Sequence, residues 1–376
     1  MSLLAQPDPD GLLEYSVVYT DRALNHMSLK FQHVMREISR VLKSVYHARS
    51  AVIVPGSGTF GMEAVARQFA TDKRCLVLRN GWFSFRWSQI LDAGRIPSDS
   101  LVLKARRGEG AGPKPFAPVP VAEAVAAIHR YRPDVVFAPH VETASGILLP
   151  DDYLHAIGTA VHDVGGLFVL DCVASGAVWV NMAASQVDVL VSAPQKGWSG
   201  PACCALVALG ERARTRIDET TSSSFACDLK KWLQIMETYE KGGHAYHATL
   251  PTDALAALRD VMLESERYGF EALRAEQWEL GRRVREILSS RGFQSVAADG
   301  FAAPGVVVCY TTDPEIQSGK KFLDAGLQTA AGVPLQCDEP ADYRSFRIGL
   351  FGLDKLHDPG RTVARLETAL NAVRAG

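Results

Sequence analysis

The chain lacks three features that would each point to a particular class of protein: a long hydrophobic run, a surplus of one charge and a spaced set of cysteines. No stretch approaches the ~18 to 20 uninterrupted apolar residues of a membrane-spanning helix. Its 40 basic and 42 acidic residues give a net charge of −2. This balance argues against a nucleic-acid-binding protein, which needs a clustered positive surplus. We therefore expect a globular protein with no nucleic-acid or membrane partner.

The cysteines and the first residues bear on the cell compartment. The seven cysteines are scattered and form no CxxC pair, disulfide framework or zinc-ligand spacing. We expect reduced thiols, no metal site and a cytoplasmic protein. Residues 1–15 carry acids and prolines where a secretory signal peptide needs positive charge and an apolar run.

Short apolar runs alternate with amphipathic helical segments through the first part of the chain. Strands that alternate with helices predict crossover units and a mostly parallel sheet covered on both faces. The expected fold class is therefore α/β. The runs are Ala51–Val54, Cys75–Leu78, Val102–Lys104, Val135–Ala138, Leu167–Leu170, Val189–Val191 and Cys204–Ala208.

The pattern changes after about residue 210. Thr252–Leu288 has apolar residues at helical spacing and no proline, which predicts one long helix. Two β-branched runs and an amphipathic last helix follow, as in a smaller α+β domain. The expected divisions are an amino-terminal arm (1–30), a large domain (31–250) and a small domain that begins with the long helix (251–376).

A glycine motif, Gly56–Gly61, follows a predicted strand and opens a helix. It matches GxGxxG, in which backbone amides at a helix N-terminus bind phosphate. A dinucleotide site also needs an acid after the next strand, and that strand ends in Arg79 instead. Because an arginine there could meet a 2′-phosphate, an NADP oxidoreductase stays open, as does a tight turn without a ligand. The motif thus predicts only an anion-binding turn.

Two further strands end in polar residues of unusual type, Asp171 and Lys196. The carboxyl ends of parallel strands share one edge of the sheet, where ligands bind, so both residues should lie near the glycine turn. A lysine, a carboxylate and a phosphate site are what pyridoxal 5′-phosphate (PLP) requires: a Schiff-base partner, a partner for the ring nitrogen and an anchor. The alternatives are a helix cap for Asp171 and a surface position for Lys196.

The segments around these residues, and nearly the whole chain, resemble the class V, fold-type I aminotransferases, particularly the alanine–glyoxylate and serine–glyoxylate group. The resemblance implies a seven-stranded large domain and PLP as cofactor. The stretches that carry it are VPGSGTFGMEAVAR, RNGWFSFRW, HVETASGILLP, FVLDCVAS, SAPQKGWSGPACCALV, HAYHATLPTDAL and FRIGLFG.

The resemblance also implies roles around the cofactor ring. Lys196 would form the Schiff base and then carry the proton between the substrate Cα and the cofactor. Asp171 would pair with the ring nitrogen through a charge-assisted bond. Val173 would lie beneath the ring, Phe83 would stack on its other face, and Thr143 would touch the side of the ring hydroxyl.

Other residues would bind the phosphate and the substrate. Tyr246 and Thr249 resemble a pair that a neighbouring subunit extends to the phosphate, which implies a homodimer with shared sites. Arg347 would clamp the substrate carboxylate, since its planar fork matches that group. On the same chain as the lysine, the phosphate would be held by Ser57, Gly58, Thr59 and Gln195.

The activity implied is ping-pong transamination of a small L-amino acid of the alanine or serine type with glyoxylate or pyruvate. The chain departs from the family at its start, where Tyr19–Met27 lies in a segment without the usual PGP turn. The donor, the acceptor and the acceptance of a phosphonate amine therefore stay open. Alternatives are a PLP lyase of the cysteine desulfurase type, using Cys337, and a scaffold that no longer catalyses. Two acids beside Cys337 would raise its pKa, against a reactive thiolate.

Overall fold

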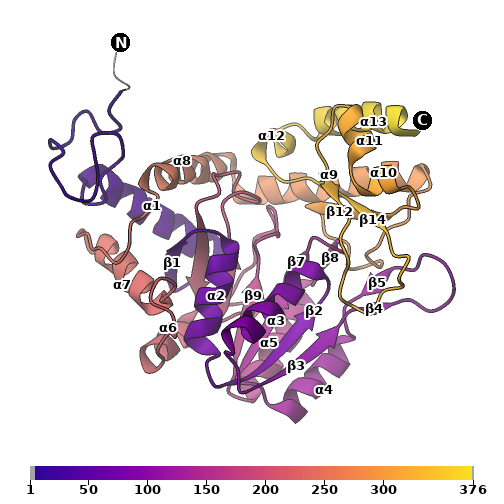
Figure 1. Cartoon of the computed structure of the whole chain (residues 1–376), viewed down its shortest axis with the longest axis horizontal. Coiled ribbons are helices and arrows are strands. Elements are labelled where there is room, and N and C mark those ends of the chain that lie inside the picture. The colour runs from indigo at the N-terminus through magenta and orange to yellow at the C-terminus, as the bar shows by residue number, and fades with distance from the viewer. Residues whose placement is uncertain (1–4, 375–376) are drawn as a thin grey trace.

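The large lobe is built on a seven-stranded sheet, seen in a computed structural model that describes residues 5–374 (Figure 1). All seven expected strands are present, and the α/β fold class is confirmed. Six strands run parallel, and one, β11, runs opposite to both of its neighbours. In spatial order the strands are β1 (Ser50–Pro55), β11 (Cys204–Leu209), β10 (Val189–Ser192), β9 (Leu167–Asp171), β6 (Val135–Pro139), β2 (Arg74–Arg79) and β3 (Asp99–Lys104).

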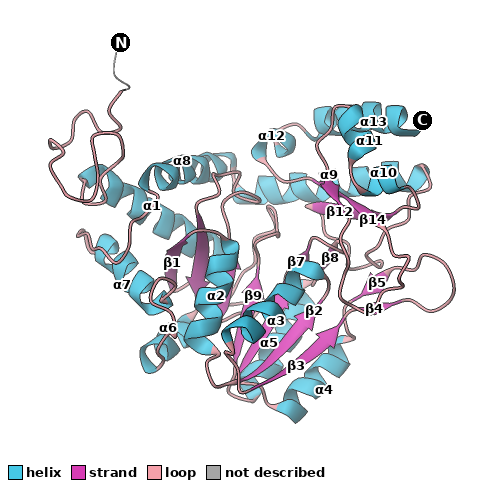
Figure 2. Ribbon diagram, viewed as in Figure 1, coloured by secondary structure: helices cyan, strands magenta, loops and turns pink. Residues whose placement is uncertain are grey.

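Helices cover both faces of this sheet (Figure 2). Right-handed crossovers place α2 and α3 on one face and α4 and α5 on the other, because the two pairs connect strands in opposite directions across the sheet. The sheet is thus buried on both faces, as its near-continuous apolar strands require. The helices of this lobe are α1 (Leu29–Tyr46), α2 (Gly58–Phe69), α3 (Trp82–Gly94), α4 (Val121–Tyr131), α5 (Asp151–Asp163), α6 (Glu211–Arg216), the 3-10 turn Ile217–Glu219 and α7 (Leu229–Glu240).

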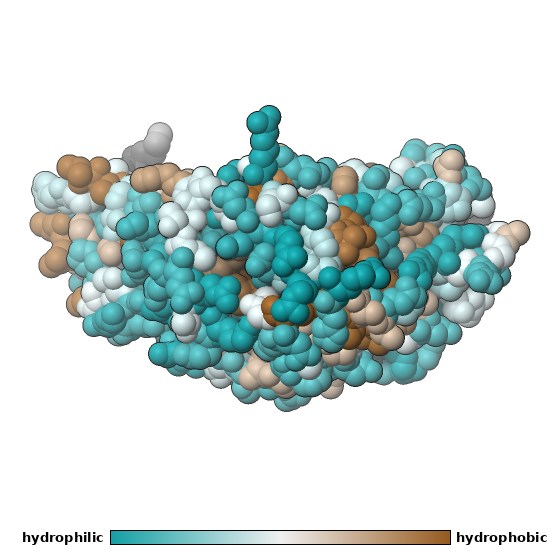
Figure 3. All heavy atoms as spheres, turned by 90° about the horizontal axis from the view of Figure 1, so that it is seen from below, coloured by the Kyte–Doolittle hydropathy of each residue, from teal (hydrophilic) through white to brown (hydrophobic). Residues whose placement is uncertain are grey.

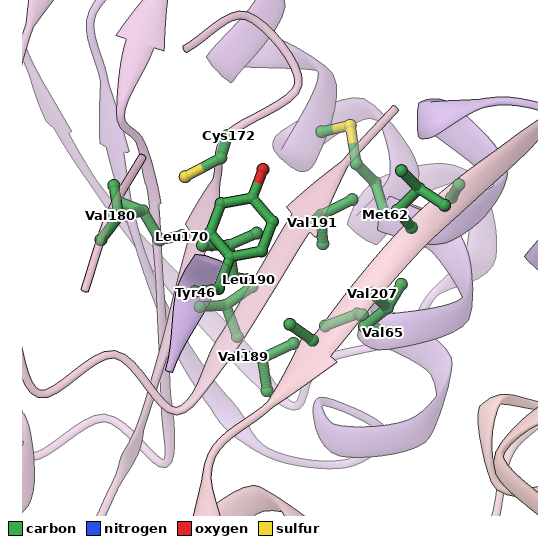
Figure 4. Close-up of a cluster of buried hydrophobic side chains, with 14 of the residues drawn as sticks. Tyr46, Met62, Val65, Leu170, Cys172, Val180, Val189, Leu190, Val191 and Val207 are labelled. Atoms are coloured by element: carbon green, nitrogen blue, oxygen red, sulfur yellow. The ribbon is translucent and has the colours of Figure 1, made fainter. Parts of the chain in front are cut away.

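Helix α2 packs closely against the sheet at Gly61. Figure 4 shows Met62 and Val65 of α2 beside Val191 and Val207 of the strands beneath. A Cβ added at Gly61 would overlap that of Ala205 and lie 3.3 Å from Cγ1 of Val191. The last glycine of the motif is therefore required by packing, which fixes where the start of α2 sits relative to the strand ends.

Replacing Gly61 by alanine should lower the free energy of unfolding by about 1–3 kcal/mol, since overpacking forces neighbouring atoms apart. The measurement is urea denaturation followed by circular dichroism. Gly360→Ala is the matched control: this helical glycine is exposed, and an added Cβ would meet its nearest atom at 3.5 Å. Equal stability of Gly61→Ala and wild type would contradict the close packing of α2.

The second lobe is smaller and follows two helices rather than one. The single helix expected over Thr252–Leu288 is corrected: Gly269, with φ of 103°, separates α8 (Thr252–Tyr268) from α9 (Phe270–Ser290). The two expected strands are present in a three-stranded antiparallel sheet, β12–β14–β13. The expected last helix is present as well. The other elements are β12 (Val306–Tyr310), α10 (Pro314–Gln317), α11 (Lys320–Asp324), β13 (Ala330–Ala331), β14 (Ser345–Gly349), α12 (Leu353–Leu356) and α13 (Pro359–Arg374).

A hairpin of β7 (Val141–Glu142) and β8 (Ile147–Leu148) joins the two lobes. The amide of Leu148 donates to the carbonyl of Phe301 at 2.7 Å, and that of Ala303 donates to Gly146 at 2.8 Å. A second hairpin, β4 (Arg106–Arg107) with β5 (Phe116–Ala117), also contacts the second lobe, since Phe116 forms a β-bridge with Ala297. The β7–β8 hairpin follows β6, so it stands at the carboxyl edge of the large sheet.

The surface seen from below is mostly hydrophilic, with separate hydrophobic patches (Figure 3). Within residues 5–374, no helix has the length and apolar character that crossing a membrane requires. The expected domain boundaries stay predictions. Residues 1–4 of the expected arm and residues 375–376 of the expected small domain lie outside the described part of the chain.

Candidate active site

The carboxyl ends of β1, β9 and β10 bring the predicted residues to one edge of the sheet. Asp171 ends β9 and lies beside Val191 of β10, and Lys196 lies in the turn after β10. A Cβ added at Gly58 would lie 2.8 Å from Cγ2 of Val173, so the start of α2 contacts the segment after Asp171. The glycine turn, the carboxylate and the lysine therefore border one site, as the parallel sheet predicts.

Asp171 is a buried carboxylate with one recorded hydrogen bond in the described residues. The amide of Val173 donates to its Oδ1 at 2.9 Å. Burial raises the pKa of Asp171 to about 6, against the opposing effects of the Val173 amide and Lys196. The charged form of such a buried carboxylate is stabilised most by a cationic partner that donates a hydrogen bond to it.

Lys196 carries an amine that no described residue binds through a hydrogen bond or ion pair. Its Nζ lies 5.7 Å from the centre of the Phe83 ring and 5.9 Å from that of Phe351. Burial lowers the pKa of Lys196, and Arg347 lowers it further, although Asp171 acts in the other direction. The neutral, nucleophilic form of the amine is therefore favoured more than in a surface lysine.

The start of α2 offers free backbone donors. Ser57 occupies the N-cap position in an extended conformation, but its side chain makes no capping hydrogen bond. Thr59 accepts a hydrogen bond from Nη1 of Arg86 at 3.0 Å, and Gln195 is exposed. Uncapped amides at a helix N-terminus form a ready site for an anion.

Glu142 is a site residue that the sequence analysis did not identify. Its carboxylate is fully buried and accepts from the amides of Phe83 at 3.2 Å, Ser84 at 2.7 Å and Ala144 at 2.9 Å. The hydroxyl of Ser84 adds a bond at 2.7 Å. Glu142 thus fixes the start of α3, where Phe83 lies, and the β7–β8 turn, where Thr143 is buried. The only sequence signal was an acid beside Thr143.

Arg347 reaches the site from the small lobe. Its Nε donates to the carbonyl of Ala331 at 2.8 Å, and its guanidinium carbon lies 5.5 Å from the centre of the Phe83 ring. Among the described residues, its two terminal nitrogens have no recorded hydrogen-bond partner. The guanidinium fork is therefore fixed at one end and free at the other, as a clamp for an acid group requires.

Tyr246 and Thr249 have recorded contacts with each other but none with the residues of this site, among the described residues. Both are exposed in the connection between α7 and α8, where their hydroxyls are 3.1 Å apart. Within residues 5–374, no recorded hydrogen bond or ring contact joins them to Lys196, Asp171 or the start of α2. The structure pairs them with each other but does not bring them to the site of their own chain.

The desulfurase alternative depends on Cys337 and the NADP alternative on Arg79, and neither side chain is free to react or bind a ligand. Cys337 is buried, its Sγ lies 3.4 Å from the carbonyl of Arg79, and burial raises its pKa to about 12. Arg79 is also buried and donates to Ser88 at 2.9 Å and to the carbonyl of Gln336 at 3.3 Å. A neutral thiol argues against desulfurase chemistry, and an engaged arginine argues against a 2′-phosphate site.

The residues at this edge fit PLP. An aldehyde needs a nucleophilic amine, which Lys196 has, and a ring nitrogen needs a buried carboxylate, which Asp171 provides. A phosphate needs free amides at a helix start, which α2 presents. Val173 and Phe83 supply apolar surface for a ring.

Comparisons with known proteins give several relatives across most of the chain, although no protein-family model matches it. It is 30% identical to the 2-aminoethylphosphonate–pyruvate transaminase of Burkholderia ambifaria, over 86% of this chain and 83% of that protein. It is 26% identical to a Synechococcus protein named soluble hydrogenase, small subunit, over 92% of this chain and 87% of that one. It is 24% identical to the alanine–glyoxylate aminotransferase of Rattus norvegicus, over 96% and 86%.

Solved structures share the fold. Ureidoglycine–glyoxylate aminotransferase from Bacillus subtilis superposes with a TM-score of 0.75 at 22% identity, covering 94% of this chain and 88% of that one. The likeness therefore extends through both lobes.

Proposed function

Because this chain belongs to the class V, fold-type I family of PLP-dependent aminotransferases, we propose that it moves an amino group from a small L-amino acid of the alanine or serine type to glyoxylate or pyruvate. The observation that carries this proposal is the meeting of Lys196, Asp171 and the uncapped start of α2 at one edge of the sheet. PLP, when bound, supplies an electron-withdrawing ring that stabilises negative charge at the donor Cα.

In this proposal some residues of the chain bind the cofactor and others hold or transfer protons. Lys196 binds the cofactor and, once released, takes the proton from the donor Cα, a role that its lowered pKa supports. Asp171 holds a proton at the ring nitrogen. Val173, Phe83 and Thr143 surround the ring, and Ser57, Gly58, Thr59 and Gln195 bind the phosphate.

Arg347 is the proposed substrate clamp. Its free terminal nitrogens match a carboxylate in a bidentate way, and a phosphonate presents the same acceptor chemistry. A second candidate reaction is therefore transamination of 2-aminoethylphosphonate with pyruvate, which the name of the relative at 30% identity favours.

The test of the function pairs each donor with each acceptor. L-Alanine, L-serine and 2-aminoethylphosphonate are incubated with pyruvate or glyoxylate and the PLP-loaded protein, and amino products are separated by chromatography. We expect glycine from glyoxylate with alanine or serine as donor. Product only from 2-aminoethylphosphonate with pyruvate would select the second candidate, and no product from any pair would contradict both.

Replacing Arg347 by methionine should raise KM for donor and acceptor by roughly 10- to 100-fold, since it removes charge-assisted hydrogen bonds to the acid group. Steady-state kinetics with both substrates measures this. Arg344→Met is the control, because Arg344 is exposed on the same segment. Unchanged KM values for Arg347→Met would show that another group binds the acid.

We also propose a homodimer in which Tyr246 and Thr249 reach the phosphate bound by the partner chain. Their exposure supports this arrangement, as does the lack of any recorded contact, among the described residues, with the site of their own chain. All seven cysteines are free and buried, which supports work in the reducing cytoplasm. The molar mass, measured by light scattering as the protein elutes from a size-exclusion column, tests the dimer. A monomer with full activity would contradict it.

A further inference from the structure

Arg86 is a half-buried cation that the roles above do not use. It lies on α3, where its Nη1 donates to Oγ1 of Thr59 at 3.0 Å. Its guanidinium carbon lies 5.3 Å from the centre of the Phe83 ring. Within residues 5–374, Arg86 has no recorded ion pair, and the one recorded effect of its charge on an acidic group is to lower the pKa of Asp171.

The place to which Arg86 points is itself positive. Thr59 stands in the first turn of α2, where the helix dipole concentrates positive charge and the amides are uncapped. A guanidinium stays charged in proteins, and Lys196 is close enough for Arg86 to lower its pKa further, after burial and Arg347. Asp171 and Glu142 offset part of this positive charge, since both raise the pKa of Lys196. A dianion bound between the start of α2 and Arg86 would interact favourably with both.

Local structure sets Arg86 in this position. It lies three residues after Phe83 on one helix, so both side chains lie on the same face of α3. The start of that helix is fixed by Glu142, which binds the amides of Phe83 and Ser84. The arginine is therefore held against α2 by a preformed framework, as a binding residue should be.

We propose that Arg86 binds the phosphate group of the cofactor, together with the start of α2. The inference rests on the proposed use of PLP but not on the reaction that follows. Arg347 has a different proposed role, since it lies in the small lobe and its terminal nitrogens would bind the substrate acid group. Arg86 would thus make charge-assisted hydrogen bonds to phosphate that the neutral groups of Ser57, Thr59 and Gln195 do not provide.

The experiment compares PLP with pyridoxal, which has the same aldehyde and ring but no phosphate. Binding of each to the cofactor-free protein is followed by absorbance and by quenching of tryptophan fluorescence. For Arg86→Met we expect the Kd of PLP to rise roughly 10- to 100-fold, with the Kd of pyridoxal changing by less than about twofold. Arg86→Lys should recover much of the PLP affinity, because it restores a charge without the fork.

Arg344→Met is the control, since Arg344 is an exposed arginine of the small lobe and its loss should leave both Kd values near wild type. An equal loss of PLP and pyridoxal binding in Arg86→Met would show a structural role and overturn the proposal, as would no loss of either. Protein that transaminates no substrate but discriminates PLP from pyridoxal through Arg86 would sink the proposed function alone.

Discussion

Replacing Lys196 by alanine is expected to reduce transamination by roughly 10³-fold or more, because one side chain is both the nucleophile and the proton carrier. The setting of the amine supports this size of effect. It has no hydrogen-bond partner in the described residues, and burial lowers its pKa. The measurement is kcat for the best donor and acceptor pair, with the visible spectrum recorded on the same sample.

The matched control is Lys241→Ala, which removes an exposed lysine on the surface of the same lobe. A small primary amine added to the Lys196→Ala protein should restore part of the rate, since it can carry the proton in place of the lost side chain. A Lys196→Ala protein that keeps a tenth of the wild-type rate would contradict the assignment.

Asp171→Asn is expected to lower kcat by roughly 10²- to 10³-fold, because a ring nitrogen without its carboxylate partner loses its proton and the ring withdraws electrons less strongly. Asparagine keeps the shape of the side chain and an oxygen that accepts from Val173, so the loss isolates the charge. Cofactor affinity should fall as well, since a neutral amide does not hold the proton at the ring nitrogen. Kinetics at saturating PLP separate the two effects.

The same substitution should leave the cofactor-free protein as stable as wild type or more stable. Burial raises the pKa of Asp171 from its ordinary 3.8 to about 6, so the folded state binds the proton more tightly than the unfolded state. This group therefore lowers stability as the pH rises through that window, and an amide in its place removes the dependence. Thermal melts at pH 4 and pH 7 test this, and a large loss of stability at both values would point to a structural role for the carboxylate.

The sequence predicts the strands and the strand-end residues well, because both follow from local patterns. Buried parallel strands appear as continuous apolar runs, and the residues after them fall on one edge. The pattern alone therefore predicts that Asp171 and Lys196 lie close together. The pattern does not predict the break at Gly269, because the apolar spacing continues through it and only the positive φ of that residue separates the helices.

Residues whose roles depend on contacts between distant segments could not be found in this way. Glu142 acts on Phe83 and Ser84, which lie about sixty positions earlier. In the sequence, Arg86 is simply a charged residue in a helical segment. Its position beside the start of α2 follows only from the contact between Arg86 and Thr59. The glycine motif shows the reverse case, since packing against Ala205 explains Gly61 without a nucleotide.

The most direct test of the account is the visible absorption spectrum of the purified protein with added PLP, during titration first with amino donors and then with a 2-oxo acid. The account predicts a yellow band that requires Lys196, falls when a productive donor is added and returns with the 2-oxo acid. Protein that gains no band with added PLP would contradict the assignment of this site to PLP.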